Sequence, residues 1–98
     1  MTKPHPRILM CRPDHYGIEY EINPWMHVQQ PVDRDLARRQ WESLTSLLGQ
    51  LGAALEFIDP MPGLPDMVFT ANAGLVRRNQ FIVSHFRHPE RQGETPLF

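Results

Sequence analysis

Pro62-Gly63-Leu64-Pro65-Asp66-Met67-Val68-Phe69-Thr70-Ala71-Asn72-Ala73-Gly74-Leu75-Val76 is the stretch that determines the expected fold. Because proline fixes a turn and cannot pair inside a central strand, we expect a strand over residues 67–71 that begins directly after Asp66. Asn72 follows six residues after Asp66, so two polar side chains would frame a hydrophobic strand and point recognition groups from a stiff element. The alternative is that Asp66 caps the turn and Asn72 lies in the next turn.

The elements around this stretch predict an α/β fold. Residues 8–11 form a continuous apolar run, typical of a strand buried on both faces. Residues 13–31 mix aromatic and charged residues, which is typical of a long functional loop. Residues 53–58 indicate a second strand, 77–80 a hairpin connection and 81–86 its return strand.

A helix is the clearest expectation, between Asp33 and Gly52. Asp33 is a good N-cap, and Gly52 supplies a stop. Apolar residues follow at helical spacing, so we expect them to form a core stripe that lies on a sheet: Leu36, Ala37, Trp41, Leu44, Leu47, Leu48 and Leu51.

Size and charge limit the possible functions. The 98 residues are enough for one small domain, and we expect a flexible leader over 1–7 and a domain over 8–98. The formal net charge of -1 does not favour binding to nucleic acid or to an anionic membrane. The single cysteine, Cys11, excludes an internal disulfide and indicates a reducing, cytoplasmic location.

Two reactive residue types, cysteine and histidine, are candidates for a catalytic or metal site. Cys11 could be a nucleophile, but a cysteine inside an apolar strand is more typical of a small buried hydrophobe. His85 and His88 are three residues apart, yet Pro89 disfavours a helix there and no cluster of cysteines or carboxylates joins them. We therefore expect surface histidines and no metal site.

A polar set made of Asn23, Asp66, Asn72 and Arg91 suits a zwitterionic, cationic amino acid. Asp66 could pair with a cation, Asn72 with a planar nitrogen group, and Arg91 with a carboxylate. Six residues of extended chain span about 20 Å. Asp66 and Asn72 could therefore not contact one guanidinium unless the chain bends between them.

Three segments together resemble the N-terminal third of a known enzyme superfamily. They are 9–14 (Leu-Met-Cys-Arg-Pro-Asp), 20–26 (Tyr-Glu-Ile-Asn-Pro-Trp-Met) and 62–75. The superfamily contains the amidinotransferases, arginine deiminases and dimethylarginine dimethylaminohydrolases, and the resemblance is greatest to its arginine-dihydrolase-like branch.

This resemblance implies a pentein fold, a five-bladed α/β propeller of ββαβ modules. The chain would supply about one and a half modules, with a mixed sheet and one long amphipathic helix. In the family a cysteine thiolate attacks the substrate guanidinium, a histidine acts as general acid and base, and the adduct is hydrolysed or transferred. No cofactor is implied.

The resemblance also assigns roles to residues. Asp66 falls on the aspartate that opens the family's substrate-binding strand, and Phe69 on an apolar position near the ligand. Asn72 stands where deiminases and dimethylarginine hydrolases carry a guanidinium-binding aspartate. This departure argues against assigning those activities directly, and the dihydrolase-like branch has asparagine there. Asn23 and Arg91 match substrate-loop and carboxylate-binding positions. The family's catalytic histidine and cysteine lie later in a longer chain, so none is expected here, and Cys11 does not inherit the role.

The expected function is therefore the substrate-binding portion of an enzyme that acts on the guanidinium of arginine or a related amino acid, inactive alone. The alternative is a non-catalytic binding or assembly module. A propeller cut after one and a half blades exposes strand edges, so it would form a homo-oligomer or complement another chain.

Overall fold

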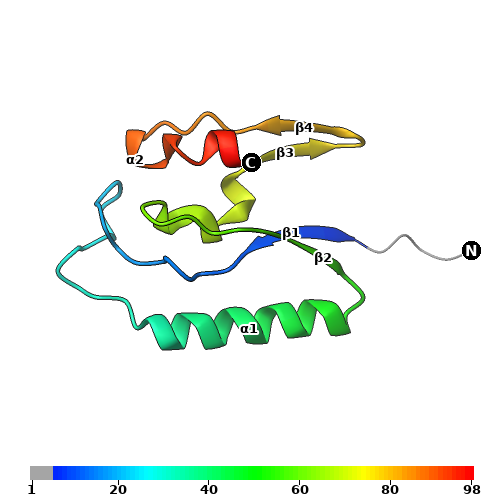
Figure 1. Cartoon of the computed structure of the whole chain (residues 1–98), viewed down its shortest axis with the longest axis horizontal. Helices are drawn as coiled ribbons and strands as arrows, with labels where there is room; N and C mark the ends of the chain where they lie inside the picture. Colours follow the sequence, from blue (N-terminus) through cyan, green and yellow to red (C-terminus); the bar gives the residue numbers. More distant parts are fainter. Residues whose placement is uncertain (1–5) are drawn as a thin grey trace, which may run out of the picture.

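The computed structural model describes residues 6–98 and has a mixed α/β architecture (Figure 1). Residues 1–5, most of the predicted leader, lie outside the described residues, and Arg7 already belongs to the first strand rather than to a leader. The elements in chain order are β1 (Arg7–Cys11), α1 (Arg34–Gln50), β2 (Ala54–Ile58), η1 (Pro65–Val68), η2 (Thr70–Asn72), β3 (Gly74–Arg77), β4 (Gln80–Val83), α2 (Pro89–Gln92) and η3 (Thr95–Leu97), where η denotes a 3-10 helix.

The first sheet is the parallel pair of β1 and β2, in which Cys11 lies opposite Ile58. Parallel neighbours need a crossover connection, and α1 supplies it. Figure 1 shows α1 below this pair and the β3–β4 hairpin above it. Both strands were predicted within one residue of their bounds. Of β1, only Met10 and Cys11 are buried, so the expectation of burial along the whole strand was wrong.

Helix α1 begins where the sequence predicts. The Asp33 carboxylate accepts a hydrogen bond of 3.0 Å from the backbone N–H of Leu36, which confirms the N-cap. Gly52, with a φ of 95°, follows the helix end.

The leucines of α1 do not form the expected core stripe. Trp41 is the buried residue of the helix, and its ring lies 5.9 Å from that of Phe57. A sheet of two strands is only about 5 Å wide between its strand axes. One large side chain covers that width, and Leu44, Leu47 and Leu51 remain 47%, 51% and 74% exposed.

The predicted strand over 67–71 is wrong, because the chain forms two successive 3-10 turns there. Pro65 occupies the first turn of η1, where its fixed φ suits a helical start. Phe69 N–H donates to the Asp66 carbonyl (3.0 Å), and Ala73 N–H donates to the Thr70 carbonyl (2.9 Å). Asp66 and Asn72 thus lie in turns, as in the alternative interpretation, although no side chain caps η1.

The hairpin connection was predicted at the right place. β3 and β4 pair antiparallel from Gly74 opposite Val83 to Arg77 opposite Gln80, and Arg78 in the turn has a φ of 56°. The return strand ends at Val83 rather than at residue 86. This hairpin is a separate antiparallel sheet, so within residues 6–98 there are two small sheets instead of one mixed sheet. None of the helices described in 6–98 is long and apolar enough to span a membrane.

Candidate functional site

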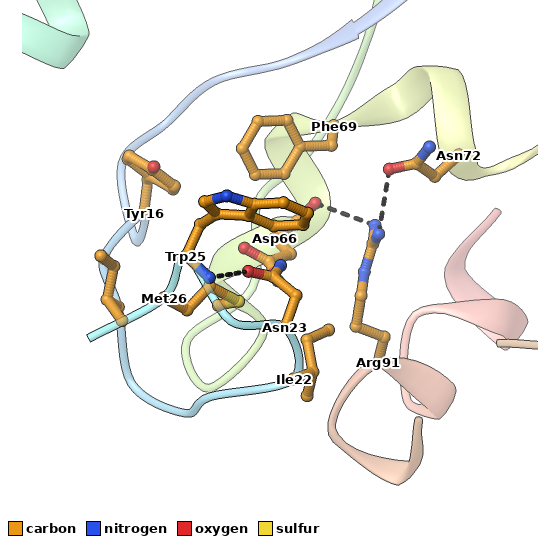
Figure 2. Close-up of a pocket in the computed structure, with 11 residues that line it drawn as sticks. Tyr16, Ile22, Asn23, Trp25, Met26, Asp66, Phe69, Asn72 and Arg91 are labelled. Atoms are coloured by element: carbon orange, nitrogen blue, oxygen red, sulfur yellow. Dashed lines mark hydrogen bonds between the residues drawn. The ribbon is translucent and has the colours of Figure 1, made fainter. Parts of the chain in front are cut away.

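A cavity of about 440 Å³ lies between the loop that precedes α1 and the turns η1, η2 and α2 (Figure 2). The structure brings all five predicted site residues to its wall: Asn23, Asp66, Phe69, Asn72 and Arg91. Tyr16, Trp25 and Met26 add apolar surface to the same wall. That these residues bind a ligand stays a prediction.

Asn23 organises the loop side of the cavity. Its amide oxygen accepts a hydrogen bond of 3.0 Å from the backbone N–H of Trp25, an Asx turn that Figure 2 shows. Its carbonyl accepts from Met26 N–H at 3.3 Å. These bonds give the loop a defined course, and they leave the Nδ2 group of Asn23 as the part able to donate to a ligand.

Phe69 joins the loop to the turns. Its ring meets that of Tyr16 edge to face, with ring centres 5.7 Å apart. Phe69 is nevertheless partly exposed into the cavity, so it serves as an apolar wall and not as buried core.

Asp66 is a buried carboxylate. Its Oδ2 accepts a hydrogen bond from the Tyr20 hydroxyl. Burial raises the pKa of Tyr20, and the hydrogen bond to Asp66 and the charge of that carboxylate raise it further. Tyr20 belongs to one of the three resembling segments but is not among the predicted site residues. An aromatic residue with a hydroxyl group, set in a polar loop, is the sequence signal that could have indicated its contact with Asp66.

Arg91 is buried and makes four hydrogen bonds to protein groups. Two of them, from Nε (2.8 Å) and Nη2 (2.9 Å), go to the carboxylate of Glu94. Nη2 also donates to the Asp66 carbonyl (3.1 Å), and Nη1 donates to the amide oxygen of Asn72 (3.1 Å). The guanidinium lies 4.3 Å from the centre of the Phe86 ring. Burial lowers the pKa of Arg91, but the hydrogen bond and charge of Glu94 outweigh it, so the pKa is raised.

Glu94 is the main residue that sequence reasoning missed. Its side chain is 0% exposed and takes the bidentate place that we expected for a ligand carboxylate. The i, i+3 spacing from Arg91, after a proline that starts a helical turn, is the signal that could have found it.

Asp66 and Asn72 do contact one guanidinium, and it belongs to the protein. Both accept from Arg91, Asp66 through its backbone carbonyl and Asn72 through its amide oxygen (Figure 2). The bend that this requires is supplied by η1 and η2 in place of an extended strand.

Cys11 does not line the cavity and is 0% exposed, which confirms a buried position. Burial raises the pKa of its thiol to about 11, with smaller contributions from Asp14, Glu94 and Asp59. Within the described part of the chain, no group of three or more His, Cys, Asp or Glu side chains is arranged to hold a metal ion.

Comparison with curated proteins finds clear relatives. The chain is 48% identical over 93 residues to the bifunctional arginine dihydrolase/ornithine cyclodeaminase AgrE of Nostoc sp., covering 94% of this chain and 13% of that protein. It is 45% identical over 92 residues to N(G),N(G)-dimethylarginine dimethylaminohydrolase of Mycobacterium tuberculosis, covering 94% of this chain and 30% of that enzyme. No protein-family model matches.

Solved structures agree with these relatives. The N-terminal domain of ArgZ, an arginine dihydrolase bound to its product, superposes with a TM-score of 0.87 at 44% identity, covering 96% of this chain and 34% of that one. A mutant of AgrE in complex with L-arginine also gives 0.87, at 45% identity over 95% of this chain and 14% of that one. The chain thus spans between 13% and 34% of the length of these proteins. Over nearly its whole length the chain is therefore similar in sequence and fold to part of the guanidino-group-modifying enzymes, a superfamily that includes arginine dihydrolases and dimethylarginine dimethylaminohydrolases.

Proposed function

We propose that this chain is the substrate-binding portion of an enzyme that acts on the guanidinium of arginine or a related amino acid. The observation that carries the proposal is the meeting of Asn23, Asp66, Phe69, Asn72 and Arg91 at one cavity. A carboxylate at Asp66 suits a cationic group, the amide of Asn72 suits a planar nitrogen group, and N–H donors on Arg91 suit a carboxylate. A zwitterionic, cationic amino acid matches all three.

The covalent chemistry would lie outside this chain. A cysteine that acts as the nucleophile must be ionised to the thiolate and must contact the substrate. The burial and raised pKa of Cys11, and its absence from the cavity wall, support a structural role for it. Hydrolysis or amidino transfer would then need the histidine and cysteine that the family carries in later modules.

Binding without turnover is the experimental signature. L-arginine should raise the melting temperature of the 98-residue chain, since a ligand at about 100 times its Kd adds about 2.7 kcal/mol to stability. Asp66→Asn should abolish the shift, whereas Glu90→Gln, on the exposed side of α2, should keep it. No ornithine, citrulline or ammonia should form. Turnover that survives Cys11→Ser, or an absent thermal shift, would contradict the proposal.

The proposal also includes the fold to which this chain contributes. Residues 8–98 would form about one and a half ββαβ modules of a pentein propeller, with α1 as its long amphipathic helix. The match to a third of the ArgZ N-terminal domain supports this. A cytoplasmic location is proposed on the evidence of the single reduced cysteine.

A second candidate, a binding or assembly module, is favoured by the β3–β4 hairpin. Leu75, Val76 and Ile82 are 65%, 69% and 64% exposed, on strands whose outer edges are unpaired within residues 6–98. Such a hairpin would form a homo-oligomer or complement another chain. Light scattering with size-exclusion chromatography should then show a mass that rises with concentration and falls for Ile82→Lys. A constant monomer mass would exclude the homo-oligomer.

A further inference from the structure

Glu94 has a feature that the proposed binding role does not explain. It is a carboxylate with 0% of its side chain exposed, and both oxygens receive hydrogen bonds from one residue, Arg91. A buried ion pair is costly to desolvate and gives uncertain net stability. Its geometric effect is definite, because a side-on pair fixes the plane of the guanidinium.

The orientation of that plane determines which N–H donors of Arg91 remain available to a ligand. The guanidinium has five N–H groups. Nε and Nη2 use three of them on Glu94 and the Asp66 carbonyl, and Nη1 uses one on Asn72. Among the described residues, one N–H of Nη1 has no acceptor, and Arg91 lines the cavity.

The fixed guanidinium also determines the orientation of the Asn72 amide. Because a guanidinium only donates, the atom of Asn72 that faces it must be the oxygen. Figure 2 shows this bond. The amide therefore presents its Nδ2 group, with two N–H donors, to other partners. Arg91 and Asn72 together form a donor edge of the cavity.

We propose that Glu94 is a positioning residue: it fixes the guanidinium of Arg91, and through it the amide of Asn72, so that the remaining N–H of Arg91 on this donor edge faces the carboxylate of an amino-acid ligand. This inference rests on the proposed function for the identity of the ligand. The internal geometry of the donor edge can be tested without a ligand.

The first test uses NMR on the ¹⁵N-labelled 98-residue chain. Glu94→Gln should shift the Arg91 Nε–H signal, speed its exchange with water and move the Asn72 Nδ2 signals. Glu90→Gln removes a carboxylate from the exposed side of α2, the helix that carries Arg91, and should change neither the Arg91 nor the Asn72 signals. Unchanged Arg91 and Asn72 signals in a folded Glu94→Gln chain would overturn the positioning role.

A measurement on the unmodified chain covers the case in which Glu94→Gln does not fold. A guanidinium held at both ends rotates slowly, so Arg91 should give separate Nη signals at low temperature. One averaged Nη signal would overturn the positioning role.

The second test titrates two ligands, L-arginine and agmatine, which lacks the carboxylate. Glu94→Gln should raise the Kd for L-arginine about tenfold, the loss expected for a weakened charge-assisted hydrogen bond. It should change the Kd for agmatine less than twofold, and Glu90→Gln should change neither. Equal losses for both ligands would overturn the role of the donor edge. Failure of the unmodified chain to bind L-arginine would overturn the proposed function, while the NMR result decides the positioning role separately.

Discussion

The amide oxygen of Asn72 lies 3.1 Å from Nη1 of Arg91, and this bond joins two turns that are 19 residues apart in the chain. It closes the wall of the cavity between η2 and α2. Because Glu94 holds the other side of the guanidinium, the bond is anchored in buried structure and not in a mobile surface contact.

Removing Arg91 should be strongly destabilising. Arg91→Met leaves the Glu94 carboxylate buried without a counter-charge, so we expect a loss of about 3–5 kcal/mol in the free energy of unfolding. The double variant Arg91→Met with Glu94→Gln removes the buried charge and should recover part of this loss. Urea unfolding followed by circular dichroism checks both, and equal stability of the single and double variants would refute the argument.

Tyr20→Phe should weaken the fold by about 1–2 kcal/mol, because a buried Asp66 oxygen loses its donor. The pKa of Tyr20 is raised in the folded state. Its stabilising contribution is therefore complete below the pKa of unfolded tyrosine, about 10, and is lost as the pH rises toward the folded value.

Absorbance titration of the two tyrosine phenols tests the raised pKa of Tyr20. The native chain should contain a component that ionises at higher pH than free tyrosine. That component should vanish in Tyr20→Phe and persist in Tyr16→Phe. Its persistence in Tyr20→Phe would show that the assignment to Tyr20 is wrong.

Cys11 should be almost inert to thiol reagents in the native state. With its pKa raised to about 11, about one thiol in a thousand is ionised at pH 8, and the residue is fully buried. Its contribution to stability is complete below the unfolded pKa of about 8.5 and is lost as the pH rises through about 11. Labelling with a disulfide reagent at pH 8 should be fast only in denaturant. Fast labelling of the native chain would contradict the burial of Cys11.

The N-cap of α1 is testable with a conservative control. Asp33→Ala removes the acceptor of the Leu36 N–H bond and should cost about 1 kcal/mol. Asp33→Asn keeps an acceptor and should cost little. Thermal unfolding compares them, and similar losses for both would mean that the charge of Asp33, rather than its bond, stabilises the helix.

Two glycines should respond oppositely to alanine. A Cβ at Gly74 would meet the Ile82 carbonyl and approach the Phe81 ring to 2.7 Å, so Gly74→Ala should destabilise the hairpin by about 1–3 kcal/mol. A Cβ at Gly49 would meet no atom within 4 Å, so Gly49→Ala should stabilise α1 by about 1 kcal/mol. Denaturant midpoints measure both, and a neutral Gly74→Ala would contradict the close approach of β3 and β4.

Local signals predicted the elements whose cause is local. Asp33 and Gly52 bound α1 because a cap and a stop act within a few residues. The segment after Asp66 was different, since its Met-Val-Phe run favours a strand. Pro65 and a distant bond, from the Thr70 hydroxyl to the Leu9 carbonyl at 2.8 Å, accompany the turns found there. A partner 61 residues away is not visible in a local pattern.

The candidate site also combines features that the local sequence indicates with features that depend on distant contacts. Its five residues were named from the polar set and the resemblance, but an extended chain would have kept Asp66 and Asn72 about 20 Å apart. Glu94 was not among these five residues, because only the folded chain shows that its side chain is buried and paired with Arg91.

The two 3-10 turns between Asp66 and Asn72 impose a rule on chain length. A 3-10 helix has three residues per turn, so inserting or deleting one residue there would rotate Asn72 by about 120° away from Arg91. Three residues would restore the face but would move Asn72 by about 6 Å along the axis, too far for the bond to Arg91. Natural variation in this segment should therefore conserve its length.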